Sequence, residues 1–208
     1  EITTATATQR PATDSLATTS AALPLFEDAT AQLHGHTHTE NAFDDWDRQF
    51  LLPNALSQLG PGVAWFDLDR DGSEDLIVGT GKGGHIAVFK SAHGRLSPEP
   101  AHGPVAPADV TTILGLAENG AAHLLAGVSI WEARSTAEMT SQPAVVSIAS
   151  SRGSLAQASE PAVGSHESAT GPLALGDYDG DGKLDLFVGS RAVPMRYPVA
   201  ASSGLFKN

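Results

Sequence analysis

Three stretches of this sequence repeat one another, and this repetition limits the possible folds more than any other feature. The segments AWFDLDRDGSEDLIVGT (64–80), TILGLAENGAAHLLAGV (112–128) and ALGDYDGDGKLDLFVGS (174–190) align without gaps. Their central glycines are 48 and 62 residues apart, and their terminal glycines keep the same two spacings. A repeat of roughly 40–60 residues that contains several short strands is typical of β-propeller blades.

Short apolar runs bounded by Gly, Pro, Asp and Ser indicate strands rather than helices throughout the repeats. The predicted fold class is all-β, with propeller blades of four antiparallel strands. We expect about three blades, over units of about 61–100, 110–160 and 171–208. Later strands of the first two units are expected at 85–90, 95–99, 143–150 and 154–159.

The third unit looks unfinished, because its last residues, Gly204–Asn208, are expected to form only the start of a third strand, with no fourth. Conversely, Leu25–Thr30 resembles a fourth strand without the first three. About three blades do not close a ring, so we predict an incomplete propeller within a segment that covers residues 24–208.

Residues 1–23 form a low-complexity stretch of Thr, Ala and Ser with almost no large apolar side chains. Such a segment cannot offset the entropy of its own ordering, which favours a flexible leader or linker. The alternation in Thr3–Thr8 allows a second interpretation, an extended arm that adds a strand to another chain's sheet.

The chain is acidic, with 24 Asp and Glu against 12 Lys and Arg and a net charge of −12. This balance argues against a nucleic-acid or anionic-membrane surface, which needs clustered basic residues. The absence of cysteine excludes disulfides and thiolate metal sites. No apolar run approaches the roughly 20 residues of a membrane span. The chain starts at Glu1, which suggests a processed or trimmed N-terminus.

Acidic residues concentrate in the first and third repeats, at loop positions 1, 3, 5 and 9 with Gly at position 6. Oxygen ligands at odd positions and a glycine at the turn suit Ca²⁺, so two calcium sites are predicted. Backbone carbonyls at position 7, from Ser73 and Lys183, are the expected fifth protein ligands. The predicted carboxylate ligands are Asp67, Asp69, Asp71 and Asp75 in one loop and Asp177, Asp179, Asp181 and Asp185 in the other.

The main competing interpretations are an EF-hand and a solvated acidic turn. An EF-hand needs Glu at position 12, where Val78 and Val188 stand, and flanking helices in place of strands. A solvated turn explains one loop better than two loops at matching repeat positions. The middle repeat should fold without metal, because its four ligand positions hold Gly115, Ala117, Asn119 and His123.

Two further segments carry polar residues that need an explanation. On a strand, His34, His36 and His38 would share one face and could hold Zn²⁺ or Cu²⁺, but a polar structural or interface role fits the same pattern. Phe43–Asp47 interleaves aromatic and acidic residues. It could rim a glycan or cation site, although anchoring of a long loop through Phe43 and Trp46 is favoured.

No motif predicts catalysis, and no catalytic or organic-cofactor residue is assigned. The glycine-rich run Gly79–Gly84 lies between strands, which favours a tight turn over a phosphate-binding loop.

The repeats GVAWFDLDRDGSEDLIVGTG and LALGDYDGDGKLDLFVGS resemble the FG-GAP/VCBS repeats of integrin-α-like β-propellers. RQFLLPNALSQLGPGVAWFDLDRDG (48–72) and the terminal SSGLFKN are similar to the bacterial VCBS group associated with ASPIC/UnbV proteins. The resemblance covers roughly residues 25–208 and is weaker in the middle repeat.

The resemblance implies a secreted, cell-surface or periplasmic propeller of about seven blades, with calcium in the outer loops. It implies a role in protein interaction, adhesion or assembly, such as a subunit of a surface polymer. A protein partner or self-assembly would complete the propeller, and a glycan is a further possible ligand. The alternative is a carbohydrate-active enzyme, a polysaccharide lyase or hydrolase, or its non-catalytic scaffold.

Overall fold

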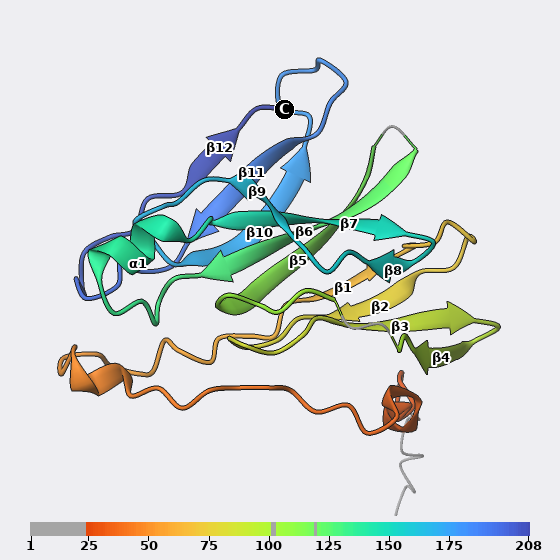
Figure 1. Cartoon of the computed structure of the whole chain (residues 1–208), viewed down its shortest axis with the longest axis horizontal. Helices are drawn as coiled ribbons and strands as arrows, with labels where there is room; N and C mark the ends of the chain where they lie inside the picture. The colour runs from red at the N-terminus through yellow and green to blue at the C-terminus, as the bar shows by residue number, and fades with distance from the viewer. Residues whose placement is uncertain (1–23, 101–102, 119) are drawn as a thin grey trace, which may run out of the picture.

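Three antiparallel sheets follow one another along the chain (Figure 1). They belong to a computed structural model that describes residues 24–100, 103–118 and 120–208. The predicted fold class is confirmed: the protein is all-β, with antiparallel sheets arranged as an incomplete β-propeller. The predicted N-terminal leader or arm, residues 1–23, lies outside the described residues.

The first sheet has four strands in sequence order, as a propeller blade requires. Its last two strands meet in a tight turn at His93 and Gly94, where φ is +50° and +75°. The strands are β1 (Val63–Phe66), β2 (Asp75–Val78), β3 (Ala87–Ala92) and β4 (Arg95–Pro98).

The central sheet has five strands, because its outer position is divided between two short ones that both pair with β7. The prediction of a single strand at 154–159 is therefore wrong. The chain leaves the sheet after Leu155 and returns at Glu160. A short helix, α1 (Thr136–Ser141), connects the second and third strands. The strands are β5 (Asp109–Glu118), β6 (Ala121–Ser129), β7 (Val145–Ser151), β8 (Ser154–Leu155) and β9 (Glu160–Val163).

The third sheet has three strands, β10 (Thr170–Gly176), β11 (Asp185–Ser190) and β12 (Gly204–Phe206), in agreement with the sequence. The strand expected at Leu25–Thr30 is not formed. Instead, the Asp28 carboxylate accepts the Thr30 N–H at 2.9 Å, and a 3₁₀-helix, η1 (Thr30–Leu33), follows.

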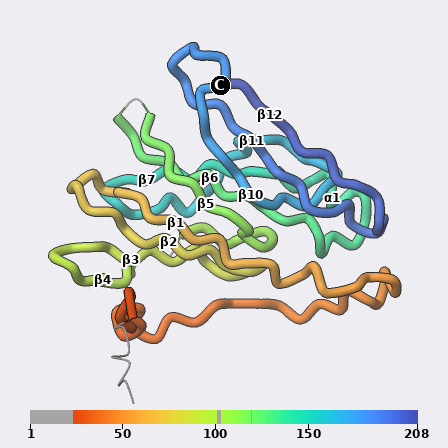
Figure 2. Tube along the Cα trace, turned by 180° about the vertical axis from the view of Figure 1, so that it is seen from behind, coloured from red at the N-terminus to blue at the C-terminus, as the bar shows by residue number. Residues whose placement is uncertain are grey.

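The three sheets stack through their first strands, since β5 contacts both β1 and β10 (Figure 2). The Gly62 N–H donates to the Val110 carbonyl at 2.9 Å, and the Thr112 hydroxyl donates to the Gly171 carbonyl at 2.9 Å. Gly115 lies against the Phe66 ring so closely that a Cβ there would fall 2.0 Å from it. The absence of a side chain at Gly115 therefore allows the first and central sheets to pack this closely.

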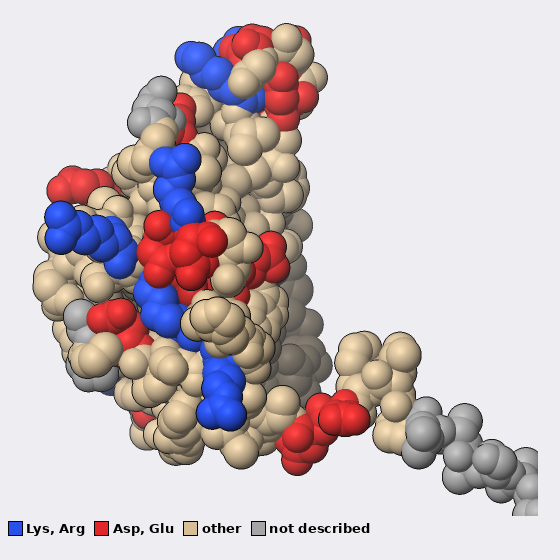
Figure 3. Space-filling view, turned by 90° about the vertical axis from the view of Figure 1, so that its right-hand side faces the viewer, with Lys and Arg blue, Asp and Glu red and all other residues tan. Residues whose placement is uncertain are grey.

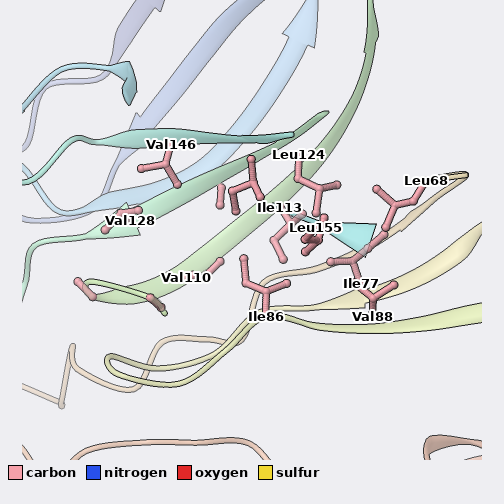
Figure 4. Close-up of a cluster of buried hydrophobic side chains, with 14 residues drawn as sticks. Leu68, Ile77, Ile86, Val88, Val110, Ile113, Leu124, Val128, Val146 and Leu155 are labelled. Carbon is pink, nitrogen blue, oxygen red and sulfur yellow. The ribbon is translucent and has the colours of Figure 1, made fainter. Parts of the chain in front are cut away.

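Both faces of the central sheet are buried, because its apolar side chains alternate along β6. Leu124, Ala126 and Val128 pack with Ile77 of β2 in the core between the first and central sheets (Figure 4). Leu125 points the other way, into the core shared with the third sheet.

A long segment before β1 passes along the first sheet and contains the second 3₁₀-helix, η2 (Asp45–Asp47) (Figure 1). We call residues 34–57 the N-terminal strap. Its His36 ring meets the Phe89 ring edge-on, with centroids 5.5 Å apart. Among the described residues, no helix has the length and apolar character needed to cross a membrane.

Candidate metal-binding loops

The β1–β2 and β10–β11 connections fold in the same way, although they lie in different sheets. In the first loop, the Asp67 carboxylate accepts the N–H groups of Asp71 at 3.1 Å and Gly72 at 2.9 Å. The corresponding bonds in the third sheet have the same lengths and join Asp177 to Asp181 and Gly182.

Two positions of each loop have a positive φ. Gly72 and Gly182, at loop position 6, have φ of +92° and +87°. A side chain at this φ would be strained, so the backbone itself explains why glycine is present. Position 4 is Gly180 in one loop and Arg70, at φ +67°, in the other.

The acidic residues at position 9 fasten each loop to its own sheet. Asp75 and Asp185 are buried, at 1 % and 2 % exposure. Asp75 accepts the N–H groups of Leu68, inside the loop, and Ser91, on β3. Asp185 accepts the equivalent pair, from Tyr178 and Asn208. Because these oxygens already accept backbone N–H groups, Asp75 and Asp185 support the loop whether or not a metal is bound.

Carboxylate oxygens converge in both loops, to within 4.8 Å of one another. The converging groups are Asp67, Asp69 and Asp71 in the first loop and Asp177, Asp179 and Asp185 in the third-sheet loop. Asp75 and Asp181 belong to neither group. The N–H groups of Ser73 and Lys183 bond to Asp71 and Asp181, and ligation by their carbonyls remains a prediction. Three converging hard oxygen donors fit Ca²⁺.

In the first and third sheets a lysine reaches these carboxylates, Lys90 from β3 and Lys207 from directly after β12. Lys90 Nζ lies 3.1 Å from Asp69 Oδ2 and 3.1 Å from Asp75 Oδ2. Lys207 Nζ contacts Asp179 and lies 3.2 Å from Asp181 Oδ2. Each ammonium therefore occupies part of the space in which a cation would bind.

Sequence reasoning missed these lysines, although the repeats contain the signal. Phe89–Lys90 and Phe206–Lys207 occupy the same register, because Leu76 pairs with Phe89 and Leu186 with Phe206. In the central sheet, which lacks the acidic loop, Leu124 pairs with Ile148, so Ala149 stands at the lysine position. Within this chain, lysine occupies this position only in the two sheets that have an acidic loop.

The lysine also alters the ionisation of the third-sheet loop. The Lys183 N–H and the Lys207 ammonium hold the pKa of Asp181 below its usual value. Contacts with Asp179 and Asp181 raise the pKa of Lys207. The Asp181 carboxylate and the Lys207 ammonium are therefore both charged at neutral pH, and a divalent cation in this loop would compete with the ammonium.

The middle repeat forms a continuous hairpin where the other two form loops. Gly115 pairs with Leu124, Leu116 with His123 and Ala117 with Ala122, at the positions where ligands would stand. Asn119, the remaining position, lies outside the described residues.

The three strap histidines do not share a face, because residues 34–38 form no strand. His34 Nε2 lies 3.0 Å from the Leu96 carbonyl oxygen, His36 meets Phe89, and His38 Nε2 lies 3.1 Å from Glu40 Oε2. None belongs to a group of converging ligands among the described residues. Their contacts support the structural interpretation rather than a shared metal.

Asp45 anchors the strap, a role that the sequence assigned to Phe43 and Trp46. Phe43 does pack against an apolar cluster around Trp131, but Trp46 is 44 % exposed. Asp45 is 3 % exposed and accepts hydrogen bonds from the N–H groups of Leu56 and Ser57, the Ser57 hydroxyl and Trp131 Nε1.

Figure 3 views the edge of the molecule onto which the β1–β2 connection opens. Acidic side chains gather there, with lysine and arginine side chains directly beside them. The candidate loops thus lie on an accessible rim, away from the cores between sheets.

Comparison with known protein families identifies one of these loops directly. Residues 173–202 form an FG-GAP repeat. The FG-GAP repeat contains most of β10, the whole third-sheet acidic loop and β11. No curated protein and no solved structure matches the chain significantly.

Proposed function

We propose that this protein is a calcium-binding, extracellular propeller module that serves in protein interaction, adhesion or assembly. The FG-GAP repeat is consistent with an extracellular interaction module of the integrin-like propeller kind. Calcium binding, secretion, adhesion and the ASPIC/UnbV association are the finer parts of the proposal. A subunit of a surface polymer is one form that such a module would take.

The observation that carries this proposal is the similar folding of two acidic loops in separate sheets. In each loop three carboxylate oxygens converge within 4.8 Å. Carboxylates this close repel one another, and a divalent cation would relieve the repulsion. We therefore propose two Ca²⁺ sites, with ligands drawn from the eight loop aspartates and the carbonyls of Ser73 and Lys183.

Isothermal calorimetry with CaCl₂ tests this proposal on the full chain. We expect Asp69→Ala and Asp179→Ala each to remove one of the loop sites, because each deletes a converging carboxylate. Glu74→Gln is the matched control, since it removes a charge from an exposed residue of the same loop outside the converging group. Equal loss of binding in Glu74→Gln, or unchanged heats in the two alanine variants, would contradict the proposal.

The partner surface that we propose is the outer face of the third sheet. Phe187 and Leu205 are cross-strand neighbours on β11 and β12, at 43 % and 55 % exposure. The opposite face of β11 is buried through Leu186 and Val188 in the core shared with the central sheet. Further blades, from another chain or a second copy, would cover the exposed face as the other sheets cover the central one.

Sedimentation velocity tests this surface. We expect Leu205→Glu to reduce self-association or partner binding by about tenfold or more, because it places a charge in the contact. Val105→Glu is the control, since Val105 is 57 % exposed but lies in the connection to the central sheet. Removal of residues 1–30 tests the proposed arm separately. Unchanged association in Leu205→Glu would refute the surface, and normal assembly without residues 1–30 would refute the arm.

A further inference from the structure

A third group of carboxylates lies away from the acidic loops, where the N-terminal strap meets the start of β5 and the connection after β6. It consists of Glu40 from the strap, Asp109 at the start of β5 and Glu132 in the connection after β6. One oxygen from each residue lies within 4.8 Å of the others.

This group is buried, unlike the two loops. Asp109 and Glu132 are each 5 % exposed, and Glu40 is half-buried. Buried carboxylates are costly unless they are paired, hydrogen-bonded or bound to a metal. The partners that these three find in the protein therefore decide what the cluster can do.

The hydrogen bonds around the cluster leave it incomplete. Glu132 Oε2 accepts the Asn41 side-chain N–H at 2.8 Å, but Glu132 Oε1 is buried and has no partner among the described residues. The Asn41 side-chain oxygen is also buried without a partner there. An unpartnered oxygen on one of the three carboxylates, Glu132, and an unpartnered amide oxygen on its hydrogen-bond partner Asn41 are expected of a cation site.

No cationic side chain neutralises the cluster fully. The Lys82 backbone N–H donates to Asp109 Oδ1 at 3.0 Å, yet its ammonium lies 3.4 Å from Glu138 Oε1. His38 pairs with Glu40 from an exposed position, and acts on Asp109 only through longer-range electrostatics. Burial is the main cause that raises the pKa values of Asp109 and Glu132 above their usual range.

The glycine-rich run beside the cluster is shaped to admit Glu40. The Gly81 N–H donates to the Thr39 carbonyl at 3.0 Å. A Cβ at Gly81 would lie 2.6 Å from that carbonyl oxygen and 2.9 Å from Glu40 Oε1. The expected tight turn at Gly79–Gly84 thus also holds the strap carboxylate close to the sheet.

We propose that Glu40, Asp109 and Glu132, together with the Asn41 amide oxygen, form a third site for a hard divalent cation such as Ca²⁺. All four donors are oxygens, which excludes a preference for soft metals. The cation would fasten the N-terminal strap to the central sheet from within. This site is independent of the two acidic loops and of the proposed calcium-dependent interaction.

The test uses the full chain with both loops disabled by Asp69→Ala and Asp179→Ala, so that only the buried site remains. Calorimetry with CaCl₂ alone should then show one site per chain. Adding Glu132→Gln should weaken that binding by about tenfold or more, because it removes a buried ligand charge. Glu160→Gln, at an exposed position on β9, should leave the binding unchanged.

Glu40→Gln provides a second ligand variant in case Glu132→Gln does not fold, because Glu40 is only half-buried. Loss of binding in either ligand variant, with binding retained in Glu160→Gln, supports the site. If the loop-disabled protein binds no cation, or if folded Glu132→Gln and Glu40→Gln bind as well as their parent, the site does not exist. The proposed function fails on a different result, equal calcium binding by the wild type and the loop-disabled protein.

Discussion

Replacing Asp45 by alanine is expected to destabilise the protein by about 3–5 kcal/mol, because it leaves several buried donors without an acceptor. Those donors are the N–H groups of Leu56 and Ser57, the Ser57 hydroxyl and Trp131 Nε1. In a chain of 208 residues, a loss of this size lowers the melting temperature by roughly 6–20 °C. The change in melting temperature is measured by monitoring thermal unfolding with circular dichroism.

Asp47→Ala is the matched control, since Asp47 belongs to the same 3₁₀-helix but is exposed. It should change stability by less than about 0.5 kcal/mol. A similar effect of the two substitutions would show that Asp45 does not anchor the strap.

The charge of Asp45 gives the stability a defined pH dependence. Burial raises its pKa, but the hydrogen bonds from Ser57, Leu56 and Trp131 together bring the pKa below its usual value. A lowered folded-state pKa contributes stability above the unfolded pKa of about 3.9, and this stability is lost as the pH falls through the folded value. Asp45→Asn should therefore lose more stability relative to wild type at pH 6 than at pH 3.

Removal of calcium is the second change expected to have a large effect. At a calcium concentration 100 times the dissociation constant, each occupied site stabilises the folded state by about 2.7 kcal/mol. Adding a chelator should lower the melting temperature by roughly 5–10 °C for each loop. Asp69→Ala and Asp179→Ala should each remove about half of the loop contribution, whereas Glu74→Gln should remove none.

Lys90→Met should increase the effect of calcium on the melting temperature, whereas the two aspartate variants should reduce it. Lys90 Nζ lies 3.1 Å from both Asp69 and Asp75, so its removal destabilises the metal-free loop and leaves Ca²⁺ without a competing charge. The variant should melt lower than wild type in chelator and gain more on calcium addition. Arg95→Met, an exposed cation of the same sheet, is the control. An unaltered calcium shift in Lys90→Met would mean that the lysine and the metal do not compete.

Much of the fold could be predicted because its signals are local. Strands such as Asp75–Val78 and Asp185–Ser190 combine β-branched and apolar residues with a turn on each side, which fixes both type and position. The strand predicted at Leu25–Thr30 failed because a strand also needs a neighbour. Asp28 instead accepts the Thr30 N–H in a turn, and the 3₁₀-helix η1, rather than a strand, lies against the edge strand β4 through the Gln32 side chain.

The acidic loops could be predicted for the same reason, since all the carboxylates of each loop lie within nine residues of one another. The anchoring role of Asp45 and the buried carboxylate cluster could not be predicted from the sequence. Asp45 bonds to Trp131, 86 residues away in the chain, and Asn41 bonds to Glu132, 91 residues away. Such contacts form only when the strap packs against the folded sheets, and no residue spacing in the sequence predicts them.

The hairpin of the middle repeat has a consequence for how the molecule assembles itself. Its strands pair continuously from Glu118 and Ala121 toward Asp109 and Ser129, with a single irregularity near Thr111. Contacts between residues so near in sequence close short loops and form early in folding. The hairpin has no acidic loop, and the flanking sheets cover both of its faces. We therefore expect this hairpin to form early in folding and the two flanking sheets to pack against it afterwards.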